Sequence, residues 1–129
     1  MRHLVLLATF CIGIYANHIS WQSNFDKAHQ RAIKEKKKLM VLLIEKNSKV
    51  SIDTIKTTFI NQPYIDKINS EYISVLVTKS QKSSYPIEML YTLTYPSLFF
   101  LDNHELFVCK PIRGEVTPNR LKSHLEKCR

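Results

Sequence analysis

The stretch Leu93-Thr94-Tyr95-Pro96-Ser97-Leu98-Phe99-Phe100-Leu101-Asp102 decides how this chain folds. Pro96 stands directly before a run of strand-forming residues, and that run ends at a turn that begins with Asp102. Proline cannot donate a hydrogen bond to a sheet ladder, so it belongs at the first residue of a strand or on an edge. We therefore predict a strand over 97–101 that follows the Tyr95–Pro96 peptide. A cis bond there would place the preceding backbone at a surface, where another chain can pair with it.

Helical and strand patterns alternate on both sides of this stretch. The order helix, strand, helix, strand, helix, strand, strand, helix predicts an α/β domain with a mixed sheet and helices on both faces. The expected elements are a helix after Ser23-Asn24, a strand over 39–44, a helix capped by Ser48 or Ser51, a short helix after Pro63, a strand over 71–78, a helix after Pro86, the strand over 97–101, its hairpin partner over 106–112 and a helix that begins at Thr117-Pro118.

The first sixteen residues form a separate segment. A basic start, Met1-Arg2-His3, precedes an apolar run over 4–14, and Ala16 supplies a small residue after it. This pattern is typical of a secretory signal peptide, and the run is too short to span a bilayer. We expect a signal peptide over 1–16 and one domain over 17–129; the alternative is a buried first strand or helix. The short signal and the lack of an Asn-x-Ser/Thr acceptor favour a bacterial periplasm, otherwise secretion.

The positive net charge of the chain does not by itself indicate a partner. The net charge of +8 becomes +7 when Arg2 leaves with the signal, and much of the excess lies in Lys34-Glu35-Lys36-Lys37-Lys38. Cations at the end of a helix complement its dipole, so a solvated helix end explains this run; a basic surface for an anionic partner is the alternative. No interleaving of aromatic and basic residues indicates nucleic acid, and no ligand spacing indicates a metal or another cofactor.

Two cysteines remain after removal of the signal, Cys109 and Cys128. A pair in an exported protein predicts one disulfide. It would close a loop of roughly 20 residues and stabilise the fold by about 3 kcal/mol. Two free thiols, a bridge to another chain and a catalytic pair are the alternatives.

The ordered set of segments resembles the thioredoxin fold over about residues 19–127. The resemblance rests on Trp21 with Phe25 and Ala28, on 38–44, on Thr58-Phe59 with 64–69, on Tyr91 and Leu93 with 95–102, and on Gly114 with 117–125. It implies a three-layer sandwich, with a mixed four-stranded sheet between helices. It also implies that an extended peptide pairs with the backbone before Pro96, a mode of strand addition that needs no cysteine.

One departure from that family concerns its chemistry. Redox members carry Cys-x-x-Cys, and counting back from Phe59 places the motif on Ser48-Lys49-Val50-Ser51. A serine hydroxyl stays protonated and cannot form a mixed disulfide, so exchange of the usual kind is not expected here. No serine-hydrolase motif surrounds Ser48 and Ser51, and helix capping explains both.

The intact fold pattern without the sulfur motif leads to the main functional prediction. We expect a non-catalytic module or scaffold that binds a protein or peptide in a groove at Tyr95 and Pro96, with Tyr85 or Tyr91 as further contacts. The alternative is a thiol-disulfide oxidoreductase that uses Cys109 and Cys128.

Overall fold

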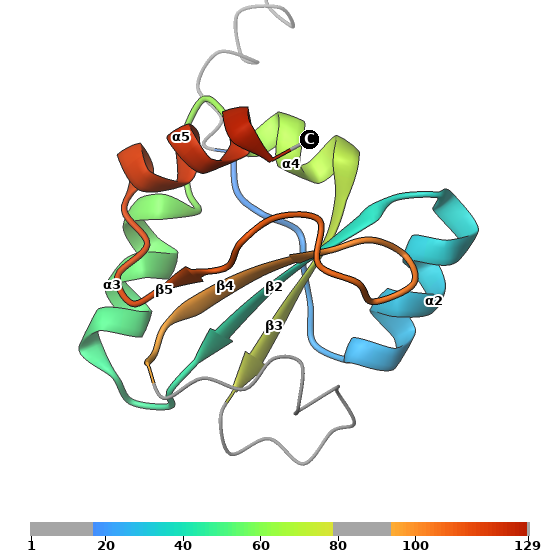
Figure 1. Ribbon diagram of the computed structural model, residues 1–129. Coiled ribbons are helices and arrows are strands. Elements are labelled where there is room, and N and C mark those ends of the chain that lie inside the picture. Colours follow the sequence, from blue (N-terminus) through green and yellow to red (C-terminus); the bar gives the residue numbers. More distant parts are fainter. Residues whose placement is uncertain (1–16, 79–93, 129) are drawn as a thin grey trace, which may run out of the picture.

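A five-stranded sheet forms the centre of the computed structural model, which describes residues 17–78 and 94–128 (Figure 1). The expected signal segment and the helix after Pro86, with Tyr85 and Tyr91, lie outside these ranges. The strand order is β1-β3-β2-β4-β5, in which β3 is parallel to β1 and β2, whereas β4 is antiparallel to β2 and β5. The strands are β1 (Trp21–Gln22), β2 (Lys38–Ile44), β3 (Tyr72–Thr78), β4 (Ser97–Leu101) and β5 (Ile112–Arg113).

Helices cover both faces of this sheet, as the sequence predicted. They are α2 (Phe25–Glu35), α3 (Lys49–Thr58), α4 (Ile65–Glu71) and α5 (Pro118–Lys127). Successive side chains of a strand point to opposite faces. Leu39 and Val41 of β2 therefore pack with α2, whereas Met40 packs with α4 and α5 on the other face. This two-sided burial explains why β2 is an uninterrupted apolar run.

The helices begin where the sequence placed their caps. The Asn24 side chain accepts a hydrogen bond from the Lys27 N–H at the start of α2. Ser48 caps α3 in the same way, and Thr117 caps α5, in which Pro118 occupies the first turn. These side chains satisfy backbone donors that have no partner within a helix.

The sheet has five strands, not the predicted four, because β1 adds a short parallel pairing to β3. Its two residues are too few to produce an alternating pattern. The hairpin partner predicted over 106–112 is present only in part, since the regular strand that pairs antiparallel with β4 is β5, at residues 112–113. Asp102 accepts hydrogen bonds from the N–H groups of His104 and Leu106, which hold a turn and lower the pKa of Asp102. Beyond this turn, the chain pairs with β4 only at the bridge from Phe107 to Leu101 before β5 begins.

No helix within residues 17–78 and 94–128 combines the length and the apolar character that crossing a membrane requires.

Candidate functional site

A disulfide joins Cys109, in the segment between β4 and β5, to Cys128 at the end of α5. The Cα atoms of the pair are 5.5 Å apart. The predicted bridge is thus confirmed, and it fastens the last helix to the segment that leaves the sheet. The alternatives of free thiols and of a bridge to another chain do not describe this structure.

The two cysteines differ in their access to solvent. Cys109 is partly exposed, whereas Cys128 is 5% exposed and packs in the apolar cluster under α5. A reactant from solvent therefore reaches Cys109 more easily. Cys128 is the C-terminal cap of α5, and its N–H donates to the carbonyl of His124. This is the negative end of the helix dipole.

His124 lies one turn before Cys128 on α5. Its ring stacks on Phe100 at a centroid distance of 5.2 Å. The Phe100 carbonyl in turn accepts a hydrogen bond from Val108, which directly precedes Cys109. The His124 Nε2 atom is buried and has no hydrogen-bond partner among the described residues. A buried, unpartnered nitrogen thus belongs to a residue one helical turn from Cys128.

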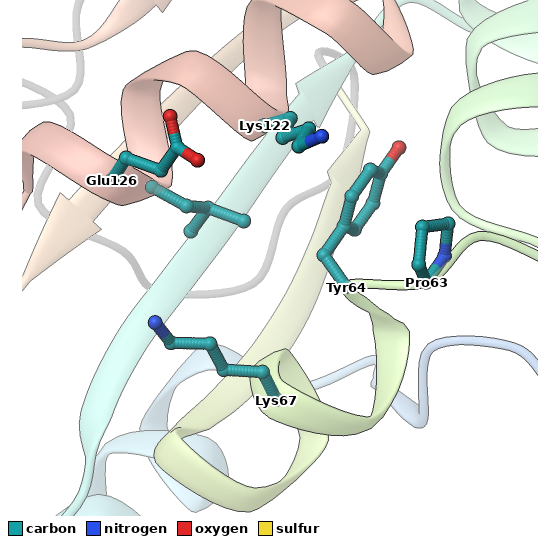
Figure 2. Close-up of a pocket in the computed structure, with 6 residues that line it drawn as sticks. Pro63, Tyr64, Lys67, Lys122 and Glu126 are labelled. Carbon is teal, nitrogen blue, oxygen red and sulfur yellow. The ribbon is translucent and has the colours of Figure 1, made fainter.

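A groove runs between α4 and α5, with Cys128 lining one end of it; Figure 2 shows the other end, around Tyr64. Its first hollow, of about 350 Å³, is lined by Lys38, Lys67, Glu71, Leu125, Glu126 and Cys128. A second hollow, of about 250 Å³, shares Lys67, Leu125 and Glu126 and extends to Pro63, Tyr64 and Lys122. We call the two hollows together the α4/α5 groove.

Tyr64 offers only its ring to this groove. Its hydroxyl donates a hydrogen bond to the Thr58 carbonyl at 2.6 Å. Burial raises the pKa of Tyr64 to about 12, so the phenol is neutral at ordinary pH. The side chain is therefore an apolar wall of the groove and not a source of charge.

Ser48 and Ser51 act as structural hydroxyls in this fold. The Ser48 oxygen accepts a hydrogen bond from the Ser51 N–H at 3.3 Å, and the Ser51 oxygen accepts one from the Glu45 N–H at 3.3 Å. Ser51 is fully buried. Both hydroxyls thus stabilise the start of α3, which agrees with their interpretation as caps.

The Tyr95–Pro96 peptide is cis and lies at the same end of the sheet as Ser48. Ser97 pairs with Leu43 near the end of β2, and the chain passes from that end to Ser48. The Pro96 carbonyl accepts a hydrogen bond from the Gly114 N–H at 2.8 Å, and Tyr95 packs against the cluster on the α2 side. A peptide groove at Tyr95 and Pro96 stays a prediction.

The disulfide lies toward the opposite end of β2. Lys38, the first residue of β2, lines the α4/α5 groove beside Cys128, whereas Ser48 follows the last residue of that strand. A strand of this length spans on the order of 20 Å. The structure thus brings Pro96 and Ser48 to one end of the sheet and the two cysteines to the other.

The sequence analysis missed the groove and the position of His124. Two signals were present: His124 precedes Cys128 by four residues, and Lys122 precedes Glu126 by four. Such pairs share one face of a helix. What the sequence does not reveal is that α4 lies against this face, because that contact depends on the packing of distant elements.

Comparison with known proteins gives matches in structure alone. No protein-family profile and no curated protein sequence matches the chain. The DsbH oxidoreductase aligns with a TM-score of 0.67 at 14% identity, covering 89% of this chain and 87% of its own. A putative disulphide-isomerase from Bacteroides thetaiotaomicron aligns with a TM-score of 0.70 at 21% identity, and the alignment covers 85% of this chain and 93% of the isomerase chain. The oxidised C-terminal domain of DsbD from Neisseria meningitidis aligns with a TM-score of 0.59 at 17% identity, and the alignment covers 81% of this chain and 92% of the DsbD domain.

These matches contradict the main functional prediction, a non-catalytic binding module or scaffold. Two of the matched proteins are titled an oxidoreductase and a putative disulphide-isomerase, and this chain joins Cys109 to Cys128. The prediction rested on the serines at positions 48 and 51, which exclude the usual exchange only at that position. The findings favour the alternative, an oxidoreductase that uses Cys109 and Cys128. The chain therefore has a thioredoxin-like fold.

Proposed function

We propose that this protein is a thiol-disulfide oxidoreductase whose redox pair is Cys109 and Cys128. The observation that carries the proposal is the bridge itself, which joins a partly exposed sulfur to a buried one. This asymmetry suits exchange, because one thiol must meet the client while the other must wait to resolve the mixed disulfide. Cys109 takes the first role and Cys128 the second.

The location of Cys128 favours electron donation to the client. Thiolates at helix N-termini are stabilised by the helix dipole, and a stabilised reduced form makes an oxidising pair. Cys128 instead caps a helix C-terminus within an apolar cluster, where a thiolate gains nothing from the dipole. The disulfide state is then favoured, and the reduced pair is the electron donor.

The reaction is two successive thiol-disulfide exchanges. The Cys109 thiolate attacks one sulfur of a client disulfide; the client S–S bond breaks, a mixed disulfide forms, and the released client thiolate takes a proton from solvent. The Cys128 thiolate then attacks the Cys109 sulfur and releases the second client thiol. The client gains two electrons and two protons, and the protein forms its disulfide. A dithiol donor restores the reduced pair by the reverse exchange.

His124 is the base that we assign to the second exchange. Its unpartnered, buried Nε2 lies one turn from Cys128, so it is suited to accept the thiol proton as Cys128 attacks. The proton then leaves with the released client thiolate.

The proposal includes action outside the cytoplasm. Disulfide chemistry of exported proteins takes place in oxidising compartments. The signal-like pattern over residues 1–16 supports export, and the DsbH and DsbD matches are consistent with it.

A turnover assay tests the function. The protein, purified after export, is added in catalytic amount to a disulfide-bonded peptide and excess dithiothreitol. Samples are quenched with acid, and the amount of reduced peptide is measured by mass spectrometry. We expect reduction severalfold faster than with dithiothreitol alone. An unchanged rate would disprove the proposal.

The two single-cysteine variants assign the roles. Cys128→Ser and Cys109→Ser lose the same bridge, and each leaves one thiol. With 2-hydroxyethyl disulfide, we expect Cys128→Ser to form a mixed disulfide rapidly at Cys109, whereas Cys109→Ser reacts slowly. Equal rates would overturn the assignment of Cys109 as the attacking thiol.

A further inference from the structure

We propose that the α4/α5 groove binds an acidic, extended segment of the client, with one apolar side chain beside Tyr64, and thereby presents the client disulfide to the cysteine pair. This inference deepens the proposed function and rests on it. The groove lies on the α4 and α5 side of the sheet, away from the Tyr95–Pro96 peptide.

The shape of the groove suits a segment of chain. The two hollows share Lys67, Leu125 and Glu126, so they form one continuous depression from Pro63 to Cys128. Ligand sites have volumes of about 300–1,000 Å³, and the hollow beside Cys128, at about 350 Å³, lies within that range. A peptide along the groove would pass Cys128 at one end and Tyr64 at the other.

The charges along the groove select carboxylates. Three lysines line it, Lys38, Lys67 and Lys122, and none of them has an ion-pair partner among the described residues. The Lys38 ammonium lies 5.9 Å from the centre of the Tyr72 ring. The lining glutamates, Glu71 and Glu126, are fewer than the lysines, and the whole chain carries a net charge of +8. Complementary charge guides such partners to a surface and fixes their register.

The end of the groove near Pro63 selects an apolar side chain. Figure 2 shows the Tyr64 ring between Pro63 and Lys122, with the Lys67 side chain extending toward Glu126. The Tyr64 hydroxyl already donates to the Thr58 carbonyl, so the ring contributes apolar surface. Leu125 adds a second apolar contact. A leucine or similar residue of the client would be buried here, with its acidic neighbours reaching Lys67 and Lys122.

Fluorescence anisotropy with defined peptides tests this binding. The probe is a labelled nine-residue peptide with a central leucine and two glutamates on each side; its matched control carries lysine in place of each glutamate. The oxidised protein is used as purified after export, so that no electron transfer is required. We expect the acidic probe to bind and the basic probe not to bind, with affinity that falls as salt rises.

A pair of charge-reversal variants locates the site. Lys67→Glu with Lys122→Glu should weaken binding of the acidic probe about tenfold or more. Lys27→Glu with Lys34→Glu alters exposed residues of α2 on the other face by the same total charge and should leave binding unchanged. Equal binding of both probes, or equal loss in both double variants, would overturn the inference.

Failure of the inference and failure of the proposed function give different results. The rate of exchange with 2-hydroxyethyl disulfide, which is small and uncharged, depends on the cysteines and not on the groove. If the inference alone is wrong, that rate stays intact while probe binding is absent or insensitive to Lys67 and Lys122. If the proposed function is wrong, turnover is absent even where the probe binds.

Discussion

A buried polar atom without a hydrogen-bond partner costs about 1–3 kcal/mol, and the Nε2 atom of His124 is such an atom. A nonpolar residue of similar size would avoid this cost while still stacking on Phe100. An imidazole at this position therefore fits a state in which Nε2 acquires a partner. In the proposed reaction, opening of the disulfide creates a thiol at Cys128, one turn along α5, which is the partner we assign to Nε2.

His124→Asn should slow the second exchange and leave the first unchanged. Asparagine cannot accept the thiol proton as a base, and general bases contribute about 10²–10⁴-fold to a rate. We therefore expect the mixed disulfide at Cys109 to accumulate when the reduced variant meets a disulfide-bonded peptide, as followed by acid quench and mass spectrometry.

His104→Asn is the matched control for this experiment. His104 is exposed in the turn after β4, where only its backbone N–H contacts Asp102. This variant should close its disulfide at the wild-type rate. Equal closing rates in His124→Asn and the wild-type protein would contradict the role of His124 as a base.

The elements differ in how well the sequence predicts them. The strands β2 and β4 and the caps Asn24, Ser48 and Thr117 were predictable, because an apolar run and a capping hydroxyl or amide act within a few residues. The strand β1 was not, since it exists only through its pairing with β3.

The candidate site shows the same division between local and distant effects. The bridge between Cys109 and Cys128 followed from cysteine count and context. The groove beside it needed knowledge of how α4 packs against α5, which no local pattern encodes. The resemblance also directed attention to Ser48 and Ser51, at the end of β2 remote from both cysteines.

Thr117→Ala should destabilise α5 and the domain by about 1 kcal/mol. The Thr117 hydroxyl oxygen accepts a hydrogen bond from the Arg120 N–H at 3.2 Å, and alanine leaves this donor unsatisfied. The change is measured as the free energy of unfolding in urea. Thr57→Ala, the same chemical change within α3 at an exposed position, should have a smaller effect. Equal losses in the two variants would show that the cap is not what stabilises α5.

At the scale of the whole molecule, the bridge must serve two purposes that conflict. It ties α5 to the segment after β4, yet the proposed reaction requires it to open in every cycle. The hydrophobic core allows both, because part of it does not depend on the bridge. Apolar clusters lie on both faces of the sheet, and the one under α2, which includes Phe25, Val41 and Phe99, contains no residue of the loop closed by the bridge.

Reduction of the bridge should therefore lower stability without unfolding the protein. A separation of 19 residues between Cys109 and Cys128 corresponds to about 3 kcal/mol of stabilisation in the chain-entropy model, while domains are commonly stable by about 5–15 kcal/mol. Urea unfolding of the oxidised and reduced protein measures the difference, and far-ultraviolet circular dichroism reports whether the fold remains. The double variant Cys109→Ser with Cys128→Ser should match the reduced protein and should not respond to reductant. If the reduced protein is unfolded without urea, a cycle through this pair is impossible and the bridge is a structural fastening alone.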